Sequence, residues 1–178
     1  MGRLPPDFVE LVPELRSSVR PNRGQMLAIR VPGARLDHAY YLDRGSEYIR
    51  QGPHGTVVVG GMRKRHEDAE RTAEEAPTPE VQGELERFAE RVLGRGGEVV
   101  ARWAGTMGFT ADGLPIVSAV RLAEGGGRNI SAADHPPIAM FCGGFTGHGM
   151  SIGAATAIGA VRRLLEADQS DDGGGAGG

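Results

Sequence analysis

A glycine-rich segment near the C-terminus has the composition of a site for an electron-rich group. Four of the seven residues in 143–149, Gly-Gly-Phe-Thr-Gly-His-Gly, are glycines. Glycine permits positive φ and lets the backbone approach a ligand closely. The helix expected after this turn would direct its free N–H groups and the positive end of its dipole into it. We therefore expect ligand contacts from Gly143, Gly144, Phe145, Thr146, Gly147, His148, Gly149 and Met150.

The order of these glycines argues against a phosphate or dinucleotide site. The dinucleotide fingerprint is Gly-x-Gly-x-x-Gly and is followed by a second strand. This segment has Gly-Gly-x-x-Gly-x-Gly instead, and the helix after it leads into Asp-Asp-Gly-Gly-Gly-Ala-Gly-Gly. We expect that helix to be the last element of the fold. The alternative is a tightly packed helix whose glycines serve only the turn.

Other kinds of site lack the residues they require. No histidine has metal-ligand spacing to another or to Cys142, so no metal site is expected. No Gly-x-Ser-x-Gly motif is present to support a serine hydrolase. Cys142 lies in an apolar stretch, which favours a core residue over a nucleophile. For His148, ligand contact and a packing role both remain open.

Composition excludes several partners. The 178 residues carry a net charge of −3, which favours neither nucleic acid nor an anionic membrane surface as a partner. No apolar run reaches the length of a membrane span, and the N-terminus lacks the apolar core of a signal peptide. A single cysteine favours a reducing compartment, so we expect a cytoplasmic protein.

The pattern of the elements predicts an α+β fold with an antiparallel or mixed sheet. Hairpin-length turns separate the first short strands, expected over 25–31, 38–42, 47–51 and 56–61. Later strands are expected over 98–107 and 116–118. Residues 19–24 are expected to form a turn, and the mixed-charge run 63–71 a solvated loop.

One helix is expected to pack on this sheet, over about residues 79–93. Thr78 can cap it, Pro79 suits its first position, and Gly94 suits its end. An apolar stripe on one face would consist of Val81, Leu85, Phe88 and Val92.

The expected organisation has four parts. The strand, glycine-rich turn and terminal helix span about residues 138–166 and follow an irregular loop over 123–137. We expect an N-terminal segment over 1–18, a sheet-and-helix part over 19–137, the strand–turn–helix over 138–166, and a disordered tail over 167–178.

Three segments together resemble the FAD-dependent oxidoreductases of the D-amino-acid oxidase, sarcosine oxidase and glycine oxidase group. They are Tyr48-Ile49-Arg50 through Gly60-Gly61, Trp103-Ala104-Gly105 through Ile116-Val117, and Gly144-Phe145-Thr146-Gly147-His148-Gly149-Met150. Their order and separations match the C-terminal half of that family, over roughly residues 19–166. Arg23-Gly24-Gln25-Met26-Leu27 fits the family's entry into its substrate domain.

The resemblance implies an FAD cofactor whose isoalloxazine ring lies against residues 143–150. Positive potential there would stabilise the reduced flavin after hydride transfer from a carbon next to nitrogen. The resemblance also implies that the substrate side is formed by Tyr48, Arg50, Trp103 and Met107. Amino-acid-oxidising members often grip the carboxylate with an arginine where this sequence has Met107. An amine substrate, or a carboxylate held by Arg50, is therefore expected.

The family's N-terminal βαβ half, with its Gly-x-Gly-x-x-Gly turn, is not found before Arg23. We therefore expect the C-terminal portion of an oxidoreductase that oxidises a C–N bond, with an incomplete FAD site and no activity alone. A second chain would supply the missing half, or the chain would self-associate. The alternative is a catalytically silent remnant that acts as a binding or interaction domain without flavin.

Overall fold

The computed structural model describes residues 17–121 and 138–172, and the chain divides into two compact units. One unit is Pro21–Met107, and the other joins Gly108–Gly178 to the residues up to Arg20. The loop expected over 123–137 lies outside the described residues. The four-part organisation expected from the sequence stays a prediction.

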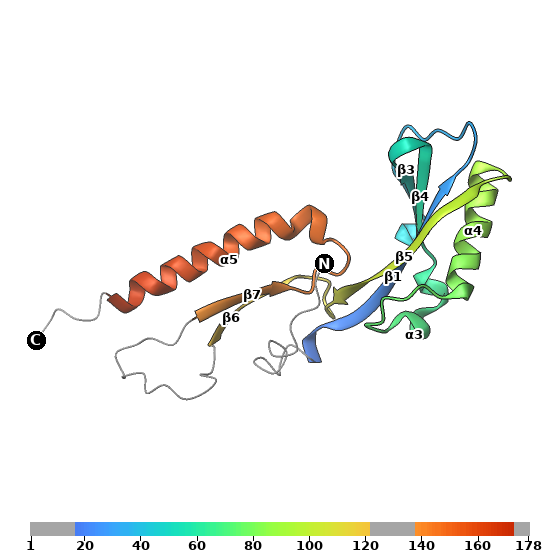
Figure 1. The fold of residues 1–178 in the computed structure, drawn as a ribbon. Coiled ribbons are helices and arrows are strands. Elements are labelled where there is room, and N and C mark those ends of the chain that lie inside the picture. The colour runs from blue at the N-terminus through green and yellow to red at the C-terminus, as the bar shows by residue number, and fades with distance from the viewer. Residues whose placement is uncertain (1–16, 122–137, 173–178) are drawn as a thin grey trace, which may run out of the picture. The chain divides into compact units, whose positions relative to one another are not determined.

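The Pro21–Met107 unit is built on a five-stranded sheet with the strand order β2-β3-β4-β1-β5 (Figure 1). Its strands are β1 (Arg20–Arg30), β2 (Tyr40–Leu42), β3 (Glu47–Gln51), β4 (Thr56–Gly61) and β5 (Glu98–Phe109). Antiparallel pairing joins β2 to β3, β3 to β4, and β4 to β1. Short 3-10 turns, η1 (Asp43–Gly45) and η2 (Pro53–Gly55), connect the hairpins, and η3 (Arg63–Arg65) follows β4. The predicted α+β fold with a mostly antiparallel sheet is confirmed.

Helix α4 (Pro79–Leu93) covers one face of this sheet and closes the core (Figure 1). It begins and ends where its capping residues predict, with Thr78 extended before it and Gly94 at φ +93° after it. Val92 was expected in the buried stripe but is 47% exposed, and the next residue, Leu93, packs against the core instead. The core consists of Leu27, Ile29, Val31, Ile49, Val57, Val59 and Met62 from the sheet region, and Val81, Leu85, Phe88 and Ala89 from α4.

Two local predictions are wrong, and a buried ion pair joins the two segments that they concern. The turn expected over 19–24 is the start of β1, and the charged run 63–71 is not wholly solvated, since Glu70 at the end of α3 (Glu67–Glu70) is only 1% exposed. Arg23 Nη2 lies 2.8 Å from Glu70 Oε1, and Gln25 Nε2 donates to the same oxygen at 2.9 Å. The hydrogen bond to Glu70 raises the pKa of Arg23.

Gln25, which donates to Glu70, also bonds to the residue just before α4. Gln25 Oε1 accepts from the backbone N–H of Thr78 at 2.8 Å, and Gln25 Nε2 donates to the Thr78 hydroxyl at 2.9 Å. The Thr78 side chain therefore does not make the capping hydrogen bond expected of it. The side chains on β1 fix the segment that leads from α3 into the helix.

The other unit contains an antiparallel ribbon and the C-terminal helix. Strands β6 (Ile116–Arg121) and β7 (Ile138–Gly143) pair with Ile116 opposite Gly143, and α5 (Gly149–Asp172) packs on both strands. The expected strand–turn–helix from residue 138 is therefore present. The helix continues beyond 166, because neither glycine nor proline occurs between Ala160 and Asp172 to end it.

Candidate functional site

The turn between β7 and α5 has a backbone that requires glycine at two positions. Gly144 has φ +71° and Gly147 has φ +83°, both in the region that side chains rarely adopt. A β-carbon on Gly144 would also lie 2.7 Å from Thr110 Cγ2. These two glycines are therefore needed for the path of the turn itself, whatever the turn binds.

Thr146, between them, is held in a strained conformation by hydrogen bonds. Its φ is +50°, which is costly for a β-branched residue. Its N–H donates to the Gly108 carbonyl at 2.9 Å, and its hydroxyl accepts from the Thr110 N–H at 3.3 Å. The hydroxyls of Thr110 and Thr146 lie 3.1 Å apart. Contacts with residues 108–110 thus fix the turn that leads into α5.

The first turn of α5 presents donors at an exposed end. His148 uses its own N–H within the turn, bonded to the Phe145 carbonyl at 2.8 Å, and its carbonyl accepts from Ser151 and Ile152. The N–H groups of Gly149 and Met150 make no hydrogen bond to any described residue, and the Met150 side chain is 97% exposed. Free donors at the positive end of a helix suit an electron-rich ligand.

The ring of His148 is bonded back to the turn. Its Nδ1 lies 2.9 Å from the carbonyl oxygen of Thr146. Since a carbonyl only accepts, Nδ1 must carry a proton, which leaves Nε2 as the acceptor of the neutral ring. His148 could contact a ligand through its backbone N–H or through its ring. The backbone N–H already donates to the Phe145 carbonyl, so the exposed ring is the group that remains available.

The predicted substrate residues lie in the other compact unit, on the sheet face opposite α4. Tyr48 alternates with the buried Ile49, and its hydroxyl lies 3.2 Å from Met26 Sδ. Met107 Cε lies 2.8 Å from the position that a β-carbon on Gly24 would take. Since Leu27 points into the core, Met26 and Gly24 lie on the other face, and Tyr48 and Met107 lie there with them.

Trp103 shares this face, as the contacts of its neighbour show. Arg102 forms an ion pair with Glu86 of α4 at 2.6 Å, so Arg102 lies on the helix side and Trp103, 40% exposed, on the opposite side. Arg50 follows Tyr48 by two residues and is exposed, with its Nη1 donating to the Gln51 carbonyl at 3.3 Å. All four predicted residues therefore share one face of the sheet.

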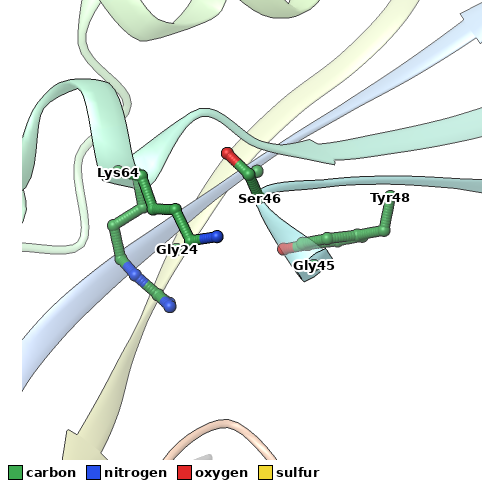
Figure 2. A pocket seen from close by; sticks show the side chains of 7 residues that line it. Gly24, Gly45, Ser46, Tyr48 and Lys64 are labelled. Atoms are coloured by element: carbon green, nitrogen blue, oxygen red, sulfur yellow. The ribbon is translucent and has the colours of Figure 1, made fainter. Parts of the chain in front are cut away.

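A small pocket on this face includes only one of those four residues. Figure 2 shows Tyr48 and Lys64 extending toward the same hollow. Burial raises the pKa of Tyr48, with a further contribution from Tyr41, and Arg63 opposes that shift. The hydroxyl of Tyr48 is therefore a donor at neutral pH. The pocket is lined by Gly24, Gly45, Ser46, Tyr48, Gly61, Arg63 and Lys64.

Sequence reasoning missed Arg63 and Lys64 because they open a run of charged residues. The available signal was their position directly after Gly60, Gly61 and Met62, where a predicted strand ends beside the strand of Tyr48.

Within residues 17–121 and 138–172, no three His, Cys, Asp or Glu side chains gather in a way that could hold a metal ion. No helix in this part of the chain has the length and apolar character needed to cross a membrane.

Two solved structures that match this chain come from longer chains. The crystal structure of L-proline dehydrogenase from P. horikoshii matches with a TM-score of 0.52 and 19% identity, covering 79% of this chain and 34% of that one. Glycine oxidase from Bacillus cereus ATCC 14579 gives a TM-score of 0.45 and 19% identity, covering 56% and 26%. At such identities only the fold is shown, and the second score is too low to support an inference. The chain spans about a third of the length of the proline dehydrogenase.

Family membership follows from the sequence comparison. The search of curated proteins found no match. A family model described as DAO, FAD dependent oxidoreductase, matches residues 7–163. Because this match covers far more than half of the sequence, the chain belongs to the DAO family of FAD-dependent oxidoreductases.

Proposed function

We propose that this chain forms the substrate face and the flavin-ring contact of an oxidoreductase that oxidises a C–N bond of an amine or amino acid. FAD, the cofactor of the family, accepts a hydride in such reactions. The observation that carries the proposal is the glycine turn before α5, at an exposed helix start where the N–H groups of Gly149 and Met150 make no hydrogen bond to a described residue.

The residues of this turn fit one edge of an isoalloxazine ring. That edge carries carbonyl oxygens and a ring nitrogen that become more negative on reduction. The N–H groups of Gly149 and Met150 and the dipole of the 24-residue helix α5 supply positive potential for it. Gly147 and Gly149 add no side chain between backbone and ligand. We assign the flavin contacts to Gly147, His148, Gly149 and Met150.

The direct test is a titration of the purified 178-residue chain with FAD, FMN and riboflavin, followed by quenching of flavin fluorescence. All three share the isoalloxazine ring, so the proposal expects similar saturable quenching by each. A silent interaction domain would leave the fluorescence of all three unchanged, and that outcome would remove the proposed function.

We further propose that the ADP part of FAD is held elsewhere in the enzyme, either on a second polypeptide or on another part of a longer one. The chain's own FAD site would then be incomplete, and the chain inactive alone. Support comes from α5, where Ile158, Val161 and Leu165 are each more than half exposed. Their spacings of three and four place them on one face, an apolar stripe suited to another protein surface. A cytoplasmic location remains a proposal that rests on the single cysteine, Cys142.

This stripe should make the isolated chain self-associate. We expect the average mass from light scattering to rise with concentration, and the double variant Ile158→Lys, Val161→Lys to remain monomeric, because two charges disrupt an apolar contact. Glu75→Lys is the matched control: it changes the net charge by the same amount at an exposed position on the other unit, and should still associate. A wild-type chain that stays monomeric at high concentration would contradict this expectation.

A further inference from the structure

Two threonine side chains that are 36 positions apart in sequence, Thr110 and Thr146, bond to each other at the turn before α5. The Thr110 N–H donates to the Thr146 hydroxyl at 3.3 Å, and the two hydroxyl oxygens lie 3.1 Å apart. A hydroxyl has one proton to donate, and that of Thr110 goes to the Leu114 carbonyl at 2.8 Å. Thr110 Oγ1 is therefore the acceptor in this pair, and the Thr146 hydroxyl is its donor. The Gly144 carbonyl, at 3.3 Å, is the more distant acceptor for the same proton.

The fold fixes Thr110 in place without a ligand. Its hydroxyl is bonded to the carbonyl of Leu114, whose N–H in turn donates to Asp112 Oδ1 at 3.0 Å. Its methyl carbon Cγ2 lies 2.7 Å from the position that a β-carbon on Gly144 would take. All these residues belong to the same compact unit as the turn and α5. The Thr110 side chain is thus a preformed support for the turn.

Of the two residues that Thr110 contacts in the turn, only Thr146 needs the support. Gly144 has φ +71°, which glycine adopts freely. Thr146 has φ +50°, which is costly for a β-branched residue. Its N–H is bonded to the Gly108 carbonyl at 2.9 Å, and its hydroxyl is bonded to Thr110. Without these bonds the ordinary right-handed conformation would be favoured, and the chain would enter α5 along a different path.

We propose that Thr110 is a positioning residue for the flavin ring and acts through Thr146. The hydrogen bonds of Thr110 hold Thr146 in its left-handed conformation, and this sets where the N–H groups of Gly149 and Met150 lie. Those two groups make no hydrogen bond to a described residue, so their position is what the ring would meet. This inference rests on the proposed function and adds a residue that supports the flavin contact without making it.

The first test compares Thr110→Val, which loses the hydroxyl, with Thr110→Ser, which keeps it. Thr110→Val should weaken riboflavin binding about threefold to tenfold in fluorescence-quenching titrations. In the chain without flavin it should also move the Cα and Cβ NMR signals of Thr146, which report the backbone conformation. Thr110→Ser should keep the wild-type affinity and signals. Thr106→Val is the matched control, because it removes a hydroxyl that donates to the Ala73 carbonyl at 3.1 Å in the other unit, and it should change neither.

A second test removes the need for the support. Glycine adopts φ +50° without the help of hydrogen bonds, so in a Thr146→Gly background the further change Thr110→Val should cause no additional loss of riboflavin affinity. Thermal unfolding checks that each variant folds. The glycine background also keeps the comparison possible if Thr110→Val alone does not fold.

Wild-type affinity in a folded Thr110→Val variant would overturn the role of Thr110, as would equal losses in Thr110→Val and Thr110→Ser. A further loss in the Thr146→Gly background would overturn it too. The proposed function would survive each of these results. It fails instead if the wild-type chain does not quench riboflavin fluorescence, and the role of Thr110 toward the flavin then fails with it, even if the Thr146 signals move.

Discussion

Valine in place of Gly147 should lower the affinity of the chain for riboflavin about tenfold or more, a larger loss than His148→Ala causes. Gly147 has φ +83°, which a β-branched residue adopts only at a cost of about 1–3 kcal/mol. The turn must therefore shift, and the new side chain also crowds the donors of Gly149 and Met150. His148→Ala removes only an exposed ring and leaves the backbone path intact. Fluorescence-quenching titrations of both variants measure the difference.

Gly55→Val is the matched control for this substitution. Gly55 has φ +74°, and no atom lies within 4 Å of where its β-carbon would be, so the backbone strain is similar. It belongs to the other compact unit, in the turn between β3 and β4. The Gly55→Val variant should bind riboflavin with wild-type affinity. A folded Gly147→Val variant with wild-type affinity would remove the turn from the flavin site.

Glu70→Ala should lower the free energy of unfolding by about 3–5 kcal/mol. Arg23 is 3% exposed, and the substitution removes its buried carboxylate partner, so that only the exposed Glu74 carboxylate, 3.8 Å away, remains to balance its charge. Gln25 Nε2 also loses one of its two acceptors, Glu70 Oε1, and keeps only the Thr78 hydroxyl. Denaturant unfolding followed by circular dichroism measures the change.

A neighbouring carboxylate provides the comparison. Glu67 forms its ion pair with Arg71 at the surface, where both side chains are about half exposed or more. Surface pairs of this kind contribute at most about 1 kcal/mol, so Glu67→Ala should be nearly neutral. If both alanine variants lost the same stability, the Arg23–Glu70 pair could not be the contact that fixes this part of the fold.

Local signals were enough to predict most of the elements of the sheet unit. Strands β3 and β4 begin and end where expected, because both are bounded by turn residues next to them in sequence. Helix α4 is predicted equally well by Thr78, Pro79 and Gly94. These features depend on residues only a few positions apart.

The missed features depend on residues far apart in sequence. Strand β1 lies beside β5, which is far from it in sequence, and the buried Glu70 bonds to Arg23, 47 positions earlier. Glu67 and Glu70 are both acidic residues in the same charged run, and nothing in the sequence shows which of them is buried. Burial decides between them, and burial is a property of the folded chain.

The candidate flavin site also combines features that could be predicted from neighbouring residues with features that depend on distant ones. Glycines followed by a helix were sufficient to predict the turn and the start of α5, and the electron-rich ligand at residues 143–150 stays a prediction. The left-handed conformation of Thr146 was not predictable, because it depends on hydrogen bonds to Gly108 and Thr110, more than 30 residues earlier. Arg50 was suggested for a carboxylate because Met107 stands where amino-acid-oxidising members often have an arginine, and Arg50 does not line the pocket beside Tyr48.

The flavin contact of the turn before α5 is tested most directly by backbone amide NMR spectra of the chain during titration with riboflavin. We predict that the N–H signals of Gly147, Gly149 and Met150 shift saturably and by more than those of the sheet unit. It would be contradicted if these three signals stayed in place while riboflavin bound elsewhere, or if no amide responded to any flavin.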